Sequence, residues 1–120
     1  MNFDEAREKH AQWRFKFRSA ILKKETFDVD AIARDDRCDL GKWLHGEAKA
    51  KYSRLPSYAA CVKEHANFHI EASKVAKVIN AQNYEEARAL LDMGSGFSIA
   101  SAAIGTALNR LEKEAGGSTG

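Results

Sequence analysis

Residues 58–80 read YAACVKEHANFHIEASKVAKVIN, and this stretch decides the fold. Its apolar side chains recur every three or four residues, a spacing that places them on one stripe of an α-helix. Two histidines, His65 and His69, lie on the same stripe four residues apart. The stretch therefore predicts a helix of about six turns with two imidazoles on its buried side.

Residues 3–21 carry the same periodicity, and His10 lies in the middle of their apolar stripe. Residues 13–18 alternate aromatic and basic side chains, which is also typical of a strand or of a surface that stacks single-stranded nucleic acid. The helical stripe accounts for more residues than the alternation, so we prefer the helix. Phe15 falls on the opposite face, which predicts a second contact surface for another helix or another subunit.

The segment that follows has less regular character. Residues 23–37 show no sustained period and are expected to form a long connection. A short helix is expected from about Cys38 to His45, where a glycine follows. Asp35 or Asp36 is available as the N-cap of this short helix.

The last third of the chain predicts a helix with a break. Asn83 and Glu86 have the spacing of a capping box, so a helix is expected to begin there. Residues 93–96 contain two glycines and interrupt the pattern. Ser95 is placed to cap the final helical segment.

Three long amphipathic helices, one of them broken, and one short helix predict an all-α fold. We expect an antiparallel four-helix bundle with an additional short helix that carries the candidate ligand Cys38. A chain of 120 residues has the size of one domain. The domain is expected to span residues 1–115, followed by a flexible tail over residues 116–120.

Charge and composition exclude several classes of partner. Lys and Arg total 19 against 17 Asp and Glu, and a net charge of +2 does not indicate binding to nucleic acid or to a membrane surface. The charged N-terminus lacks the apolar run of a signal peptide, and no stretch approaches the roughly 20 apolar residues of a membrane helix. We therefore expect a cytoplasmic protein, in which two cysteines indicate metal or redox chemistry rather than a disulfide.

Three histidines on apolar stripes are the first candidates for chemistry. His10, His65 and His69 would face one small core, where the donor and the acceptor of each imidazole need partners. One metal ion would satisfy all three rings, and the spacing of His65 and His69 suits two ligands of one tetrahedral ion. The alternative is that they are ordinary core histidines bonded to protein groups.

Cys38 is the better candidate for a sulfur ligand. It lies at the predicted start of a helix, where the dipole and free N–H groups favour a thiolate. Cys61 lies on a buried stripe and is better explained as a small core residue. His45 lies at a helix C-terminus, which explains it without a metal. Three imidazole nitrogens and one thiolate would suit Zn²⁺ better than an oxygen-seeking ion.

These residues form a pattern that resembles a known family. Cys38-Asp39-Leu40-Gly41-Lys42-Trp43-Leu44, preceded by His10-x-x-Trp13 and followed by His65-x-x-Phe68-His69, is similar to the chemoreceptor zinc-binding (CZB) domain over about residues 6–111. The resemblance implies a bacterial helical bundle that binds one zinc ion through His10, Cys38, His65 and His69. The side chains expected to support the site are Trp13, Asp35, Asp36, Trp43 and Phe68.

The resemblance also implies a function. Members of the family usually occur as regulatory modules of cytosolic chemoreceptors, diguanylate cyclases and related signalling proteins, often as homodimers. We therefore expect a sensor that regulates an attached or associated signalling domain and responds to zinc, or to oxidation of Cys38 by oxidants such as hypochlorous acid. Loss of the bond to Cys38 is expected to move residues 35–46.

Two other interpretations remain. Zinc could be a structural staple in a dimerisation module that senses nothing. A hemerythrin-like di-iron enzyme is disfavoured, because such a site needs more histidines and paired carboxylates, and this chain has four His in all. Four protein ligands leave no open coordination position, so no enzymatic activity is expected.

Overall fold

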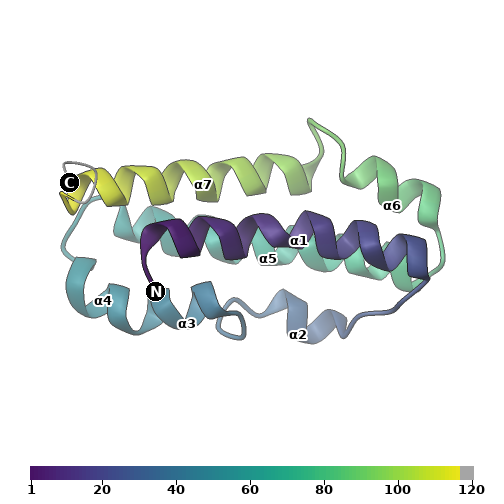
Figure 1. The fold of residues 1–120 in the computed structure, drawn as a ribbon, viewed down its shortest axis with the longest axis horizontal. Helices are drawn as coiled ribbons and strands as arrows, with labels where there is room; N and C mark the ends of the chain where they lie inside the picture. Colours follow the sequence, from purple (N-terminus) through teal and green to yellow (C-terminus); the bar gives the residue numbers. More distant parts are fainter. Residues whose placement is uncertain (117–120) are drawn as a thin grey trace.

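A computed structural model describes residues 1–116, and every regular element within them is a helix. The predicted all-α fold is therefore confirmed (Figure 1). In chain order the helices are α1 (Phe3–Lys23), α2 (Val29–Ala33), α3 (Asp39–His45), α4 (Glu47–Tyr52), α5 (Tyr58–Asn80), α6 (Tyr84–Leu90) and α7 (Gly96–Glu114). Residues 117–120, which form most of the expected tail, lie outside the described residues.

The helices form a bundle of four segments, each antiparallel to the one before it. Helix α1 runs in one direction, α2, α3 and α4 return beside it, α5 runs forward again, and α6 and α7 return (Figure 1). The second segment therefore consists of three short helices, α2, α3 and α4, whereas only one short helix, from about Cys38 to His45, was predicted. No helix within residues 1–116 combines the length and apolar character needed to cross a membrane.

The core lies where the three long helices meet. Their apolar stripes supply its largest fully buried side chains, each of which stabilises the fold by about 1.5–3 kcal/mol on burial. These include Phe17 of α1, Phe68 and Ile79 of α5, and Ile104, Leu108 and Leu111 of α7. The stripes that predicted the long helices are thus the faces that pack together.

One predicted helix cap is wrong, and a second lacks its predicted side-chain bonds. Helix α3 is capped by Cys38, whose Sγ accepts the N–H of Gly41 at 3.2 Å, and not by Asp35 or Asp36. The helix begins at Asp39, so only residue 38 occupies the N-cap position.

The capping box at the start of α6 does not form. Asn83 is the N-cap residue as predicted, but among the described residues its side chain makes no capping bond and instead donates from Nδ2 to the Glu86 carboxylate at 2.7 Å. By contrast, Ser95 caps α7 as predicted, since its Oγ accepts the N–H of Ser98 at 3.1 Å.

Candidate metal centre

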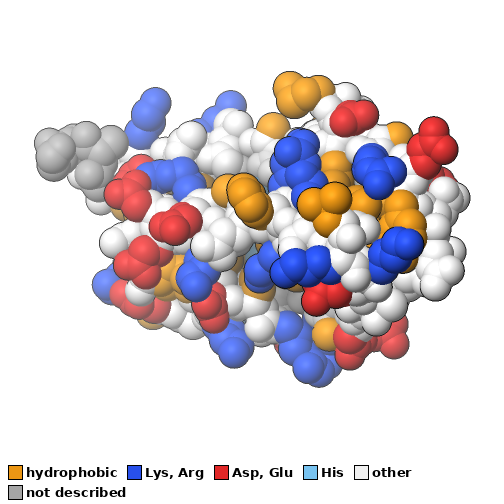
Figure 2. Space-filling model, turned by 45° about the vertical axis from the view of Figure 1, so that its right-hand side comes forward, with side chains coloured by type: hydrophobic (Ala, Val, Ile, Leu, Met, Phe, Trp, Pro, Cys, Tyr) orange, Lys and Arg blue, Asp and Glu red, His pale blue; other side chains and the backbone are white. Residues whose placement is uncertain are grey.

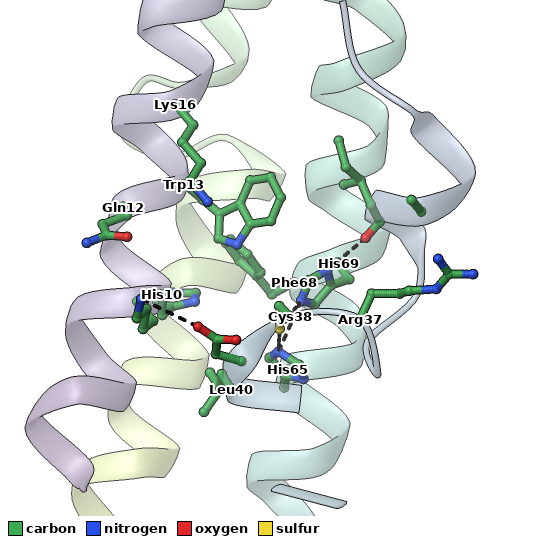
Figure 3. A pocket seen from close by; sticks show the side chains of 14 residues that line it. His10, Gln12, Trp13, Lys16, Arg37, Cys38, Leu40, His65, Phe68 and His69 are labelled. Atoms are coloured by element: carbon green, nitrogen blue, oxygen red, sulfur yellow. Dashed lines mark hydrogen bonds and ion pairs between the residues drawn. The ribbon is translucent and has the colours of Figure 1, made fainter. Parts of the chain in front are cut away.

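Three of the four predicted ligands meet where the start of α3 faces α5. The Cys38 Sγ lies 3.2 Å from His65 Nε2 and 3.3 Å from His69 Nε2, and the two Nε2 atoms are 3.0 Å apart. His65 and His69 project from successive turns of α5, and Cys38 reaches them from the end of the preceding loop (Figure 3). Within the described residues, these three form a group able to hold a metal ion.

The hydrogen bonds around the cluster leave lone pairs at its centre. His69 Nδ1 lies 2.7 Å from the Ile32 carbonyl, and a carbonyl only accepts, so Nδ1 carries the proton and Nε2 presents a lone pair. The Cys38 sulfur already accepts the N–H of Gly41. His65 Nδ1 is buried and has no hydrogen-bond partner among residues 1–116. Two acceptors, the Cys38 sulfur and His69 Nε2, therefore converge with Nε2 of a second imidazole, His65.

The triangle fits a zinc ion. Zinc binds nitrogen at about 2.0–2.1 Å and sulfur at about 2.3 Å, so the edges of its tetrahedron measure about 3.3–3.6 Å between ligand atoms. The observed edges of 3.0–3.3 Å need to lengthen by only about 0.3 Å. One soft sulfur and imidazole nitrogens are also donors that Zn²⁺ prefers.

Burial keeps the histidines neutral. It lowers the pKa of His65 to about 3, with a further contribution from the charge of His69, and it lowers the pKa of His10 to about 4. Burial also lowers the pKa of His69. A neutral imidazole is the form that binds a metal, so these rings need to lose no proton at pH 7.

The thiol behaves in the opposite way to the sequence expectation. Burial raises the pKa of Cys38, and the N–H groups of Gly41 and Leu40 only partly oppose this effect. The helix start therefore does not yield a thiolate in the absence of a metal. Cys61 is fully buried, lies outside the group of three ligands, and has its pKa raised by burial to about 12.

His10 lies on the other wall of the same cavity. It projects from α1 and is 7% exposed, and the centroid of its ring lies 4.2 Å from that of Phe68, whose ring also contacts His69 (Figure 3). Its Nε2 contacts Ser101 of α7, 3.2 Å from the carbonyl and 3.0 Å from Oγ. His10 is not among the three residues whose ligand atoms converge.

The five expected supporting residues divide into two groups. Trp13 and Phe68 lie against His69, with ring centroids 6.0 and 5.6 Å away. The other three side chains make their contacts with other residues: Asp35 pairs with His45 at 3.1 Å, Asp36 pairs with Arg34 at 3.1 Å, and Trp43 packs on Phe3 at 5.3 Å. The charge of Asp35 still acts on the cluster, since it favours a higher pKa of His65 and of His69 and so opposes part of the effect of burial.

Sequence reasoning missed the role of Gly41. A Cβ at this position would lie 1.6 Å from the Asp35 carbonyl oxygen and 3.2 Å from His65 Cε1. Only glycine allows the loop before α3 to pass so close, and the same residue donates its N–H to Cys38. A glycine inside a predicted helix was the signal that could have identified it.

A cavity of about 350 Å³ opens onto the cluster. Cys38, His10, His65 and His69 line it together with three basic side chains, Lys9, Lys16 and Arg37 (Figure 3). Cys38 is partly exposed, whereas the histidines are buried. Cys38 is therefore the most exposed residue of the cluster.

Comparison with known proteins agrees with this geometry. The family model of the chemoreceptor zinc-binding domain matches residues 10–76, which is more than half of the chain and contains Cys38, His65, His69 and His10. No match was found among curated proteins or among solved structures. The resemblance first noted over about residues 6–111 is thus confirmed over residues 10–76, and the chain belongs to the chemoreceptor zinc-binding domain family.

Proposed function

We propose that this domain is a zinc-dependent sensor that regulates an attached or associated signalling domain. The observation that carries the proposal is the convergence of Cys38, His65 and His69 within 3.3 Å, with the proton of His69 held away by Ile32. In the proposed site His10 is the fourth ligand. A shell of four protein ligands has no position for substrate, so the domain is proposed to have no enzymatic activity.

The proposed signal is zinc itself or oxidation of Cys38. Lys9, Lys16 and Arg37 line the cavity with one acidic side chain, Asp39, which pairs with Lys9 at 3.4 Å. The remaining positive charge favours the approach of small anions, including anionic oxidants. Oxidation converts the thiolate to a sulfenate and so alters the one sulfur ligand. The partial exposure of Cys38 supports this role, since an enclosed sulfur would react slowly.

The proposed output is movement of residues 35–46. Cys38 joins the start of α3 to α5, while the Tyr58 hydroxyl donates to the Leu44 carbonyl at 2.5 Å near the other end of α3. Loss of the sulfur contact would therefore free the N-terminal end of α3 first. Unchanged hydrogen exchange of residues 35–46 after oxidation of the zinc-loaded protein would contradict this mechanism.

The proposed assembly is a cytoplasmic homodimer in a bacterium. Phe15 is 82% exposed and Leu22 80% exposed on the outer face of α1, and Ile99 is 62% exposed on α7. Figure 2 shows hydrophobic side chains gathered on one face, with Lys and Arg side chains around them. Sedimentation at several concentrations tests the dimer, and replacement of Phe15 by Ser should weaken it.

Metal analysis of the purified protein tests the central proposal. We expect about one zinc per chain in the wild type. Cys38→Ala should lose most of this zinc, whereas Cys61→Ala, a matched change at the other cysteine, should retain it. A wild-type protein purified without chelator that contained no zinc would refute the proposal.

The alternative is a structural zinc staple in a dimerisation module. The specific observation in its favour is the deep burial of His65 and His69, at 1% and 2% exposure. A competition titration separates the two functions, because a sensor must release zinc at free concentrations that occur in a cell. A staple would bind far more tightly, and oxidant would leave its structure unaltered.

A further inference from the structure

Ser101 of α7 holds one ring nitrogen of His10. The His10 Nε2 lies 3.0 Å from Ser101 Oγ and 3.2 Å from the Ser101 carbonyl oxygen, and His10 lines the same cavity as Cys38, His65 and His69. The ring is 7% exposed, so water does not offer an easy substitute for these contacts.

The carbonyl decides which nitrogen carries the proton. A carbonyl oxygen only accepts, so His10 Nε2 must be the N–H, and in a neutral ring Nδ1 then has the lone pair. The same arrangement holds His69, whose Nδ1–H is directed at the Ile32 carbonyl and whose Nε2 faces the cluster. Two of the histidines are thus fixed in one tautomer by a neighbouring helix, α2 for His69 and α7 for His10.

We propose that Ser101 is a positioning residue of the metal site, because it fixes His10 in the Nε2–H tautomer and leaves Nδ1 as the nitrogen that binds zinc. This inference rests on the proposed function in one respect, namely that His10 is a ligand. A ligand histidine commonly donates its second N–H to a protein oxygen, which fixes the ring and makes it a better ligand. Helix α7 thereby becomes part of the metal site although it supplies no ligand.

The hydroxyl, and not only the carbonyl, matters to this role. In a regular helix the carbonyl of Ser101 also accepts the N–H four residues later, from Gly105. The hydroxyl is the nearer oxygen to Nε2, and within residues 1–116 its hydrogen-bond partner is His10. Loss of Oγ would leave His10 with a shared acceptor, and the population of the alternative tautomer should rise.

Long-range ¹⁵N–¹H correlation spectra of the imidazoles test the tautomer directly. In zinc-free wild-type protein we expect His10 in the Nε2–H form, and on zinc loading we expect the metal-induced shift at Nδ1. A zinc-free His10 in the Nδ1–H form, or a metal shift at Nε2, would overturn the proposal. The zinc-free spectrum gives its answer even if the wild type binds no zinc, so failure of the proposed function remains distinguishable.

Variants of α7 test the consequence for binding. Ser101→Ala should weaken zinc binding about 10-fold, which is typical for loss of a partner behind a ligand, and Ser101→Thr should restore it. Ser98→Ala is the matched control, because the Ser98 hydroxyl binds Arg14 and the Asp92 carbonyl and has no contact with His10. If Ser101→Ala only lowers the stability of the fold, while zinc affinity and the His10 tautomer stay as in the wild type, Ser101 is not a positioning residue.

Discussion

Replacement of Gly41 by Ala should disrupt the metal site through a backbone clash. The new Cβ would lie 1.6 Å from the Asp35 carbonyl oxygen, 2.8 Å from the carbon of the same carbonyl and 3.2 Å from His65 Cε1. Carbon and oxygen approach no closer than about 3.3 Å even in a weak hydrogen bond, so the two backbone segments must separate by about 1.7 Å. Neither side of this contact is a flexible side chain that could turn away.

The size of this displacement sets the expected effect on binding. Metal–ligand distances tolerate about 0.2 Å, and the same movement displaces Cys38, which bonds to the Gly41 N–H. We expect zinc affinity to fall by at least about 100-fold, the upper end of the loss seen when a partner behind a ligand is removed. The zinc-free protein should lose about 1–3 kcal/mol of unfolding free energy, as in other overpacked sites.

Gly105→Ala provides the control for this variant. Gly105 also lies in a helix, but a Cβ there would meet nothing within 4 Å. Alanine is more favourable than glycine in a helix interior by about 0.8–1.0 kcal/mol, so this variant should be more stable and bind zinc normally. Competition with a chromophoric chelator and urea unfolding measure both properties. Zinc affinity of Gly41→Ala within a few-fold of the wild type would refute the reasoning.

Three further predictions follow from the buried groups. Zinc binding near pH 7 should release about one proton, from Cys38, because the pKa values of His65 and His10 are lowered to about 3 and about 4 and both rings are already neutral. Calorimetry in buffers of different ionisation enthalpy measures the number of protons released, and a release of two or more protons per zinc would contradict this. The histidine pKa values are depressed in the folded state, so their contribution to stability is present above about pH 6.5 and lost below it. Zinc-free protein should therefore lose about 2 kcal/mol for each of these two histidines between pH 8 and pH 5, and an unchanged urea midpoint would exclude this. Phe68→Ala should lower the unfolding free energy by about 3–5 kcal/mol, because Phe68 is 1% exposed and its ring packs against His10, His69 and Phe97. A decrease of less than about 1 kcal/mol in urea unfolding would show that this packing does not stabilise the core as expected.

The sequence predicted those parts of the molecule that depend on periodicity. The long helices α1, α5 and α7 follow apolar stripes of many turns, and His65 and His69 could be placed on one face from their spacing alone. The short helices α2 and α4 were missed, because five or six residues have too few turns to show a period and are stabilised mainly by tertiary packing. The position of Cys38 beside both histidines was predicted from its place at the start of a helix and from the resemblance to the family.

The partners that orient the ligands could not be predicted, because most of them are backbone atoms. His69 is held by the carbonyl of Ile32, and Gly41 is required by the carbonyl of Asp35. Every residue has a carbonyl, so its use in a site has no signature in the sequence. For Asp35 the side chain was the predicted support, whereas the structure brings the main chain to the site and directs the carboxylate to His45.

These backbone partners connect the metal site to most of the bundle. His65 and His69 belong to α5, Cys38 caps α3, and Ile32 of α2 holds one imidazole. Helices α1 and α7 meet at His10, the proposed fourth ligand. Oxidation of the Cys38 sulfur should therefore act first on α3, because Cys38 joins the start of this helix to both histidines. A change in the contacts of His10 should act first on the packing of α1 against α7. Oxidation of Cys38 and removal of zinc should consequently differ in which helices loosen. Hydrogen exchange that increased equally in α3 and α7 after mild oxidation would mean that the site responds as one rigid staple.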